Sequence, residues 1–223
     1  RPGRGGAADG DDDHPAGGMT WGDARAFCAW LTDKELREGG LRSGWRYRLP
    51  TDHEWSVAVG IGDREDPNTS PASKSGDIKG VYPWGAQWPP ENAGNYGQEL
   101  GADSFENSAP VGNFPANLFG LFDMGGNVWE WCEDRCFSDN EVSAKRMETI
   151  RAGYEVRTCY EDIRVLRGAS WKDVNGTSLL SSARFVEVSQ LKPEGYGYEN
   201  AGFRCVLSAS GSAMGRMGSG TAV

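Results

Sequence analysis

Histidine is nearly absent from this sequence: 223 residues include only two, His14 and His53. The five cysteines are scattered, and no two of them have the C-x-x-C spacing. Structural zinc takes four closely spaced Cys or His ligands, so a zinc site is not expected. An odd number of cysteines spread over the whole chain also does not predict a dense disulfide framework.

Long apolar runs and excess positive charge are missing as well. No run approaches the ~20 apolar residues of a membrane span, so membrane insertion is not expected, and no signal-peptide pattern is recognised at the start. The net charge is −9. Phosphate backbones and anionic lipids repel so acidic a chain, and nucleic acid and membrane surfaces are therefore not expected partners. Clustered carboxylates and carbonyls suit calcium instead.

Aromatic residues and glycine are what the chain has in abundance: nine Trp, eight Phe, seven Tyr and 32 Gly. Each aromatic side chain can bury ~150–250 Å², so these few residues build a sizeable core. Glycine suits tight turns. Together they predict one irregular, loop-rich domain with few long elements.

Two helices are predicted in the first quarter of the chain. The first is capped by Thr20 with Asp23 and ends at Gly39, and its buried face is Ala24, Phe27, Cys28 and Leu31. A strand over 45–49 follows. Thr51 and Glu54 then form a capping box for a second helix, whose buried face is Trp55, Ala58 and Val59.

Little regular structure is predicted between residues 60 and 114. Residues 133–160 are polar and are predicted to be an insertion. Cys136 and Cys159 bracket it, and both a disulfide at its base and two free thiols are compatible with that spacing. Strands are predicted over 164–170 and 201–207. Residues 1–18 and 208–223 are expected to be flexible.

Seven short strings occur in a fixed order and carry a family resemblance. They are Met19-Thr-Trp-Gly-Asp-Ala with Phe27-Cys-Ala-Trp, Arg48-Leu-Pro-Thr-Asp-His-Glu-Trp, Tyr82-Pro-Trp-Gly, Ala109-Pro-Val-Gly, Asn117-Leu-Phe-Gly-Leu-Phe-Asp-Met-Gly-Gly-Asn-Val-Trp-Glu-Trp, Leu166-Arg-Gly-Ala-Ser-Trp and Gly202-Phe-Arg-Cys. The ordered set resembles the formylglycine-generating-enzyme (sulfatase-modifying factor) superfamily. This resemblance implies a C-type-lectin-like fold over 19–207, with a small twisted antiparallel sheet, two helices and long loops. The family's further N-terminal strand and helix have no match before Gly18, so either the fold or the chain is trimmed.

The resemblance also implies two calcium sites. The first would use the side chains of Asp123 and Glu130 with the carbonyls of Gly126 and Val128. The second would use Asn95 and Asp103 with the carbonyls of Tyr96 and Phe105. Alternatively, Asp123 and Asn127 only accept hydrogen bonds from loop amides.

Catalysis is not expected. Active relatives hold copper(I) with two cysteines five residues apart, and Asp173 and Ser178 occupy the corresponding positions here. A carboxylate and a hydroxyl cannot replace thiolates on a soft metal. Cys205 is interpreted as a core residue of the last strand. Iron-dependent relatives use three histidines, so neither copper nor iron is expected and no catalytic residue is predicted.

A binding surface is predicted over residues 171–201, where family-like ends frame an interior unlike the family. Rigid aromatics mixed with adaptable polar groups are typical of recognition surfaces. The candidate ligand-binding residues are Trp171, Lys172, Asp173, Asn175, Phe185, Glu187, Tyr196, Tyr198 and Asn200. Leu179, Leu180, Ala183 and Phe203 are predicted to be core, and a core position is also open for Phe185. The expected partner is a protein or another macromolecule.

Three functions stay open. The layout resembles the variable proteins of diversity-generating retroelements, whose C-terminal variable region has similar framing strings. A plain adaptor or sensor domain of a bacterial signalling protein is the alternative, and a metal-dependent oxidoreductase of the formylglycine-generating type is disfavoured. The sequence does not determine the localisation; a soluble bacterial protein, at the cell surface or secreted, fits this layout.

Overall fold

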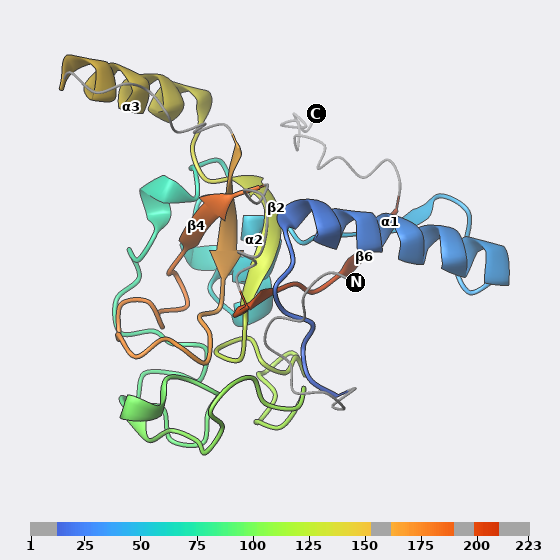
Figure 1. Cartoon of the computed structure of the whole chain (residues 1–223), viewed down its shortest axis with the longest axis horizontal. Helices are drawn as coiled ribbons and strands as arrows, with labels where there is room; N and C mark the ends of the chain where they lie inside the picture. Colours follow the sequence, from blue (N-terminus) through green and yellow to red (C-terminus); the bar gives the residue numbers. More distant parts are fainter. Residues whose placement is uncertain (1–12, 153–161, 190–198, 210–223) are drawn as a thin grey trace, which may run out of the picture.

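The computed structural model describes residues 13–152, 162–189 and 199–209 and has the mixed α+β architecture that the sequence predicts (Figure 1). The helices are α1 (Trp21–Glu38), α2 (Asp52–Val59) and α3 (Asp139–Arg151). The strands are β1 (Trp45–Arg48), β2 (Trp129–Arg135), β3 (Ile163–Arg167), β4 (Phe185–Val188), β5 (Ala201–Gly202) and β6 (Val206–Ala209). Between residues 60 and 114 there are three short 3-10 helices, turns and loops, as predicted.

Two small sheets hold the fold together. The larger has the order β4-β3-β2-β5, in which β2 and β5 run parallel and the other neighbours antiparallel. The smaller pairs β1 with β6 in antiparallel register. Each sheet therefore joins an early strand to one of the last two strands, and the amide of Gly18 also donates to the carbonyl of Ala201.

The core lies on both faces of the larger sheet because successive strand residues point to opposite sides. On β3, Leu166 packs into a cluster with Trp129 and Trp131, whereas Val165 packs into a second cluster with Trp55. Leu179, Leu180 and Ala183 are buried, as predicted, and Phe203 packs against the first cluster. The sheet thus separates an aromatic-rich layer from a layer of mainly aliphatic and sulfur-containing side chains around Trp55.

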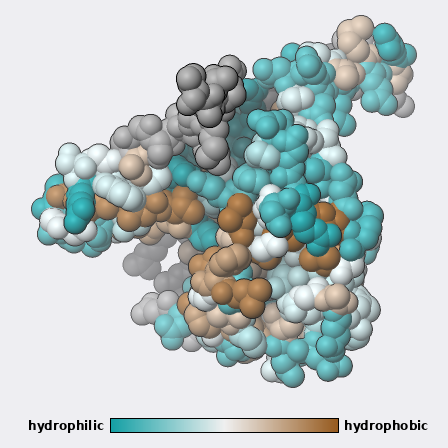
Figure 2. All heavy atoms as spheres, turned by 180° about the vertical axis from the view of Figure 1, so that it is seen from behind, coloured by the Kyte–Doolittle hydropathy of each residue, from teal (hydrophilic) through white to brown (hydrophobic). Residues whose placement is uncertain are grey.

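Helix α1 begins and ends where the sequence predicts. Thr20 and Asp23 form a full capping box, and Gly39 closes the helix in the left-handed conformation. The predicted buried face is wrong at Phe27, which is 43% exposed. Successive helix residues lie ~100° apart, so when Cys28 points into the core, Phe27 lies on the flank, where it contacts the exposed Trp30. Figure 2 shows hydrophobic residues along this helix and on the loops beside it.

Helix α2 is likewise capped by Thr51 and Glu54, as predicted. Trp55 and Val59 are buried, but Asp52 and Ser56 are buried as well. The sequence pattern missed these two polar residues because they lie on a face that meets other charges and not apolar side chains.

The predicted insertion contains a helix that the sequence analysis did not find. Helix α3 projects away from the rest of the chain (Figure 1). At its base Cys136 is a buried free thiol, while Cys159, its predicted disulfide partner, lies outside the described residues. Residues 133–160 are polar because they include this helix, which has little apolar surface to bury.

The ends of the domain differ slightly from the prediction. Strand β6 runs to Ala209, past the expected boundary at 207, because its pairing with β1 continues to Trp45. Two segments, 1–18 and 208–223, are expected to be flexible. Most of each, namely residues 1–12 and 210–223, lies outside the described residues. Within the described part of the chain, no helix is long and apolar enough to cross a membrane.

Candidate functional site

A sharp turn at the end of β3 delivers the predicted binding segment. Gly168 has φ +100° and Ala169 has φ +65°, and a Cβ on Gly168 would lie 3.4 Å from the ring of Trp55. A left-handed conformation at a non-glycine residue is uncommon and needs support from its surroundings, which the complete burial of Ala169 provides. The turn places Ser170 in the core and residues 171–178 at the surface.

Asp173, predicted from the sequence to take the place of the first cysteine of the active relatives, completes this turn. Its Oδ2 accepts hydrogen bonds from the Ser170 amide (2.9 Å) and the Ser170 hydroxyl (2.6 Å). The Asn200 amide group donates to the same hydroxyl at 2.8 Å. The Asp173 carboxylate therefore stabilises the turn, and Asn200, which is predicted to bind ligand, also contacts Ser170.

Ser178, predicted to take the place of the second cysteine, lies in a turn of its own. Its hydroxyl donates to the carbonyl of Asn175 at 2.9 Å. The side chain of Asn175 accepts from the amide and the hydroxyl of Thr177. Asp173 and Ser178 thus each make a local turn contact.

The other predicted binding residues differ in exposure. Lys172, Asn175 and Phe185 are exposed, whereas Trp171 and Glu187 are half-buried. Lys172 lies over the ring of Trp171 (4.7 Å from Nζ to the centroid) and forms an ion pair with Glu199.

Phe185 is 45% exposed, so the alternative of a core position for it is wrong. Its ring contacts Trp129 at a centroid distance of 5.4 Å. Tyr196 and Tyr198 lie outside the described residues.

A group of aromatic side chains packs against the predicted binding segment. Tyr82 and Trp84 stack at a centroid distance of 4.8 Å, and Trp88 packs beside Tyr82 at 5.4 Å. A Cβ on Gly176 would lie 3.4 Å from the Trp88 ring, so the loop rests directly on these rings. The sequence analysis gave no signal of this contact.

The first predicted calcium set lies in the Asp123–Glu130 loop. Asp123 Oδ2 accepts from the Gly112 amide at 2.7 Å, but Asp123 Oδ1 is buried without a hydrogen-bond partner. Burial raises the pKa of this carboxyl, and the Gly112 amide offsets only part of that effect. A buried carboxylate oxygen without a hydrogen-bond donor is free to bind a calcium ion. Asp123 therefore fits the predicted site.

Glu130 already has several hydrogen-bond donors. Arg204 donates to both of its oxygens at 2.5 and 2.6 Å, and the Trp55 indole donates at 2.9 Å. Arg204 also donates to the carbonyls of Phe122 and Asp123. The sequence analysis missed this contact. Glu130 would therefore have to share its oxygens between Arg204 and a cation.

The second predicted set fits in a similar way. Asn95 is fully buried, and its Oδ1 has no hydrogen-bond partner while its Nδ2 donates to the Asn107 carbonyl. Asp103 accepts from the Tyr96 amide and the Phe105 amide, both at 2.9 Å. These bonds hold the Tyr96 and Phe105 backbone around the carboxylate. Among the described residues no cluster of three His, Cys, Asp or Glu side chains forms a metal site, so each set depends on amide and carbonyl oxygens.

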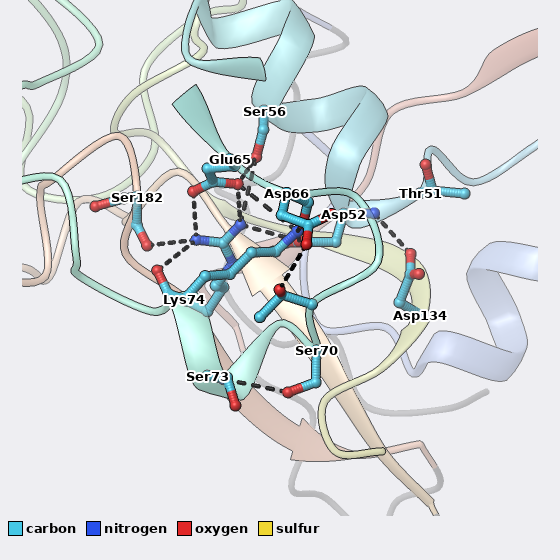
Figure 3. Close-up of polar contacts among 12 residues, drawn as sticks. Thr51, Asp52, Ser56, Glu65, Asp66, Ser70, Ser73, Lys74, Asp134 and Ser182 are labelled. Carbon is cyan, nitrogen blue, oxygen red and sulfur yellow. Dashed lines mark hydrogen bonds and ion pairs between the residues drawn. The ribbon is translucent and has the colours of Figure 1, made fainter. Parts of the chain in front are cut away.

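A third group of buried charges is satisfied within the protein (Figure 3). The Arg184 guanidinium donates to both oxygens of Asp52 and both oxygens of Glu65, at 2.5–2.9 Å. Arg167 donates to Asp52 at 2.6 Å, and the Lys74 ammonium lies 3.1 Å from it. Burial alone would raise the pKa of Asp52, but the three cations outweigh it and hold that pKa well below its usual range. No sequence motif indicated this cluster, which joins α2, β3 and the chain before β4.

Comparisons with known proteins agree with this architecture. Residues 1–209 match the Sulfatase-modifying factor enzyme 1-like domain family. The chain is 32% identical over 199 residues to "Inactive C-alpha-formylglycine-generating enzyme 2" of Bos taurus, covering 86% of this chain and 49% of that protein. It is 30% identical over 193 residues to "Serine/threonine-protein kinase pkn1" of Chlamydia caviae, covering 86% of this chain and 24% of the kinase.

Among solved structures, Treponema denticola variable protein 1 superposes with a TM-score of 0.54 at 18% identity, over 94% of this chain and 75% of that one, which shows a shared fold. The chain spans half or less of the length of the two sequence relatives above. The predicted superfamily and C-type-lectin-like fold are thus confirmed. The chain belongs to the sulfatase-modifying factor enzyme 1-like family, which is the formylglycine-generating-enzyme superfamily.

Proposed function

We propose that this domain is a non-catalytic recognition module that binds a protein or another macromolecule through residues 171–189 and 199–202. The observation that carries the proposal is Asp173. It stands where active relatives have a copper-binding cysteine, and its carboxylate is engaged with Ser170. Copper(I) binds soft thiolates, and an oxygen ligand already in use for a turn does not replace one.

The composition of the surface supports binding. Phe185 and Trp171 supply rigid aromatic area, while Lys172, Asn175 and Glu187 supply adaptable polar contacts. Tyr82 and Trp88 lie against the loop at Gly176, and this packing lowers the conformational entropy that the loop would lose on binding a ligand. The similarity to a relative named as an inactive formylglycine-generating enzyme points the same way.

Calcium is proposed as a stabiliser of this scaffold. The unmatched oxygens of Asp123 and Asn95 support one ion in each predicted set. Glu130, Gly126 and Val128 would complete the first set, and Asp103, Tyr96 and Phe105 the second. Bound calcium would neutralise the buried carboxylates and fix the loops. Our proposal gives the ion a structural role and no chemical step.

Two finer functions can be separated by gene context. A diversified variable protein needs a near-repeat of the 165–207 coding segment beside a reverse transcriptase gene. An adaptor or sensor domain needs a fused or neighbouring signalling domain, and the similarity to the kinase pkn1 favours this second arrangement.

Site-specific photo-crosslinking tests the binding surface. A photoreactive residue is placed at Lys172 or Phe185 and, as a control, at Val57, which is 49% exposed on α2. Proteins of the source organism are added, and the products are compared after competition with unlabelled wild-type domain. We expect a competed product at positions 172 and 185 only. Equal products at position 57, or copper-dependent oxygen consumption by the purified domain with a cysteine-containing peptide, would refute the proposal.

A further inference from the structure

Strand β4 is an outer strand of the larger sheet, because the order β4-β3-β2-β5 gives it β3 as its one neighbour among the described strands (Figure 1). An edge strand presents a row of backbone N–H and C=O groups that its own sheet does not pair. Residues 185–188 pair with residues 163–166 of β3 in antiparallel register. The hydrogen bonds around this register determine which groups of β4 point outward.

The outward backbone groups of β4 belong to Val186 and Val188. In an antiparallel ladder, residues that bond to the neighbouring strand alternate with residues whose N–H and C=O point away from it. The Ser189 amide donates at 2.7 Å to the carbonyl of the residue that precedes β3. By alternation Glu187 and Phe185 also bond toward β3, whereas the two valines face away. In the described part of the chain, no other backbone group pairs with either valine on that side.

One side-chain contact occupies this edge. The Val188 amide donates to Oε1 of Glu187, the residue before it, at 3.0 Å. Arg164, the cross-strand neighbour of Glu187, lies over the ring of Trp21 instead, with its guanidinium carbon 4.2 Å from the centroid. Within the described ranges Glu187 therefore has an amide and no cation as its partner, and a ligand that supplies a cation could draw it away from the amide.

We propose that the β4 edge docks an extended, positively charged segment of a partner protein, which joins the larger sheet as a further strand beside β4. This inference rests on the proposed recognition function and names the class of its ligand. The outward groups of Val186 and Val188 require a partner whose own backbone is extended, since only such a chain can match both residues. The exposed ring of Phe185, next to this edge, would cover an apolar residue of that partner.

The charge of the partner follows from Glu187. A docked strand takes the Val188 amide from this carboxylate, and a lysine or arginine of the partner would replace it. The net charge of −9 attracts a basic segment in the same way. A second copy of this chain fits poorly. Pairing that uses Val186 and Val188 of both copies would place the two Glu187 side chains directly opposite each other, where like charges are destabilising.

Proline substitution separates this docking mode from other kinds of binding. Proline has no N–H, and it is tolerated in an edge strand where that N–H would face away from the sheet. Val186→Pro should therefore keep the β3–β4 ladder and lose one bond to the partner. Val186→Ala, which keeps the N–H, is the matched control. Val188→Pro repeats the test at the second outward amide, and thermal melting with far-UV circular dichroism establishes that each variant is folded.

Short random peptides displayed on phage are the probe. They are selected on the wild-type chain, and the affinity of each selected peptide is measured for every variant by titration calorimetry. We expect basic peptides whose affinity falls about tenfold in Val186→Pro or Val188→Pro and less than about threefold in Val186→Ala. In the complex, hydrogen exchange of the Val186 and Val188 amides should slow by about tenfold or more, which a ligand bound elsewhere on the surface would not cause.

The outcomes separate this inference from the proposed function. Peptides that bind the folded proline variants as tightly as Val186→Ala, but lose affinity in Lys172→Ala, would overturn docking at the β4 edge and leave the recognition surface in place. Peptides that are indifferent to all of these substitutions would count against both. A selection without any binder would also overturn the inference, because an open edge needs an extended backbone and little else from its ligand.

Discussion

Buried carboxylates are paired with cations in one region of this molecule, whereas buried side-chain oxygens lack a partner in another. Around Asp52 and Glu65, two arginines and a lysine of the chain itself meet the carboxylates. Around Asn95 and Asp123, side-chain oxygens are buried with no donor among the described residues. Both groups lie in a chain of net charge −9, so overall charge does not explain the difference.

The comparison indicates which region is self-sufficient. A buried acceptor without a partner costs roughly 1–3 kcal/mol, and more if it is charged. The carboxylates of the Asp52 cluster avoid that cost because the chain's own cations pair with them, although Arg167 Nε has no hydrogen-bond partner. The oxygens of Asn95 and Asp123 bear it unless a cation or a water molecule from solution is bound, and this is why we propose calcium there and not at the larger carboxylate cluster.

The largest effect is expected from removing the central cation of the self-sufficient cluster. Arg184→Ala leaves Asp52 and Glu65 with Lys74 and Arg167 only, and should lower the free energy of unfolding by about 3–5 kcal/mol. Urea unfolding measures it, with Arg135→Ala, which removes an exposed pair with Asp139, as the matched control. A loss below about 1 kcal/mol would mean that the cluster is not the support described here.

The second-largest effect on stability is expected from removing calcium. At calcium concentrations of ~100 times Kd, binding adds about 2.7 kcal/mol per site, so a chelator should lower Tm by several degrees. Asn95→Ala should remove part of this response, while Asn140→Ala, at an exposed position on α3, should keep all of it. An unchanged Tm with chelator, together with no calcium in the purified protein by mass spectrometry, would refute both sites.

Lowering the pH should destabilise the protein through the Asp52 cluster and, without calcium, stabilise it through Asp123. The folded-state pKa of Asp52 and of Glu65 is lowered, so their stabilisation is complete only above about pH 5, where both carboxyls are ionised in the unfolded chain, and is lost as the pH falls further. The pKa of Asp123 is raised, so without calcium its protonation favours the folded state.

Unfolding curves in chelator from pH 7 to pH 3 test this contrast. The stability of Asp123→Asn relative to wild type should decrease as the pH is lowered, because protonation relieves the wild-type protein of its buried charge. A constant difference across this range would argue against a strained carboxylate at position 123.

The smallest effect is expected at the base of α3. Glu141 accepts from the hydroxyls of Ser70, Ser73 and Ser138. Burial opposes ionisation there, but these bonds outweigh it and lower the pKa of Glu141 to about 2. Because the site is mostly exposed, Glu141→Gln should cost less than about 1 kcal/mol. Hydrogen exchange should nevertheless increase in residues 139–148, with Glu148→Gln as control, and an unchanged exchange rate would show that Glu141 does not anchor the helix.

The sequence was sufficient for the elements whose signals are local. Capping at Thr20 and Thr51, the left-handed ending at Gly39 and the ordered family strings are patterns of adjacent residues. Burial of Phe27 was predicted wrongly because the narrow stripe that α1 buries depends on where β1 and the segment around Phe203 pack against the helix.

The site was predictable only in part for the same reason. The Arg204–Glu130 pair and the contact between Arg184 and Asp52 join residues 74 and 132 positions apart. No periodicity records such partners, since they are set by the tertiary fold. The exposed character of Lys172 and Asn175, by contrast, was readable from their polarity.

The pairing of β1 with β6 has a consequence for synthesis. Strands that pair across most of the chain cannot form their ladder until the last of them has left the ribosome, and such long-range closure is slow. An emerging chain that ends before residue 201 would expose the β2 edge that β5 later covers, together with the whole of β1. A truncated or stalled product of this gene should therefore be bound by chaperones rather than persist as a smaller folded domain.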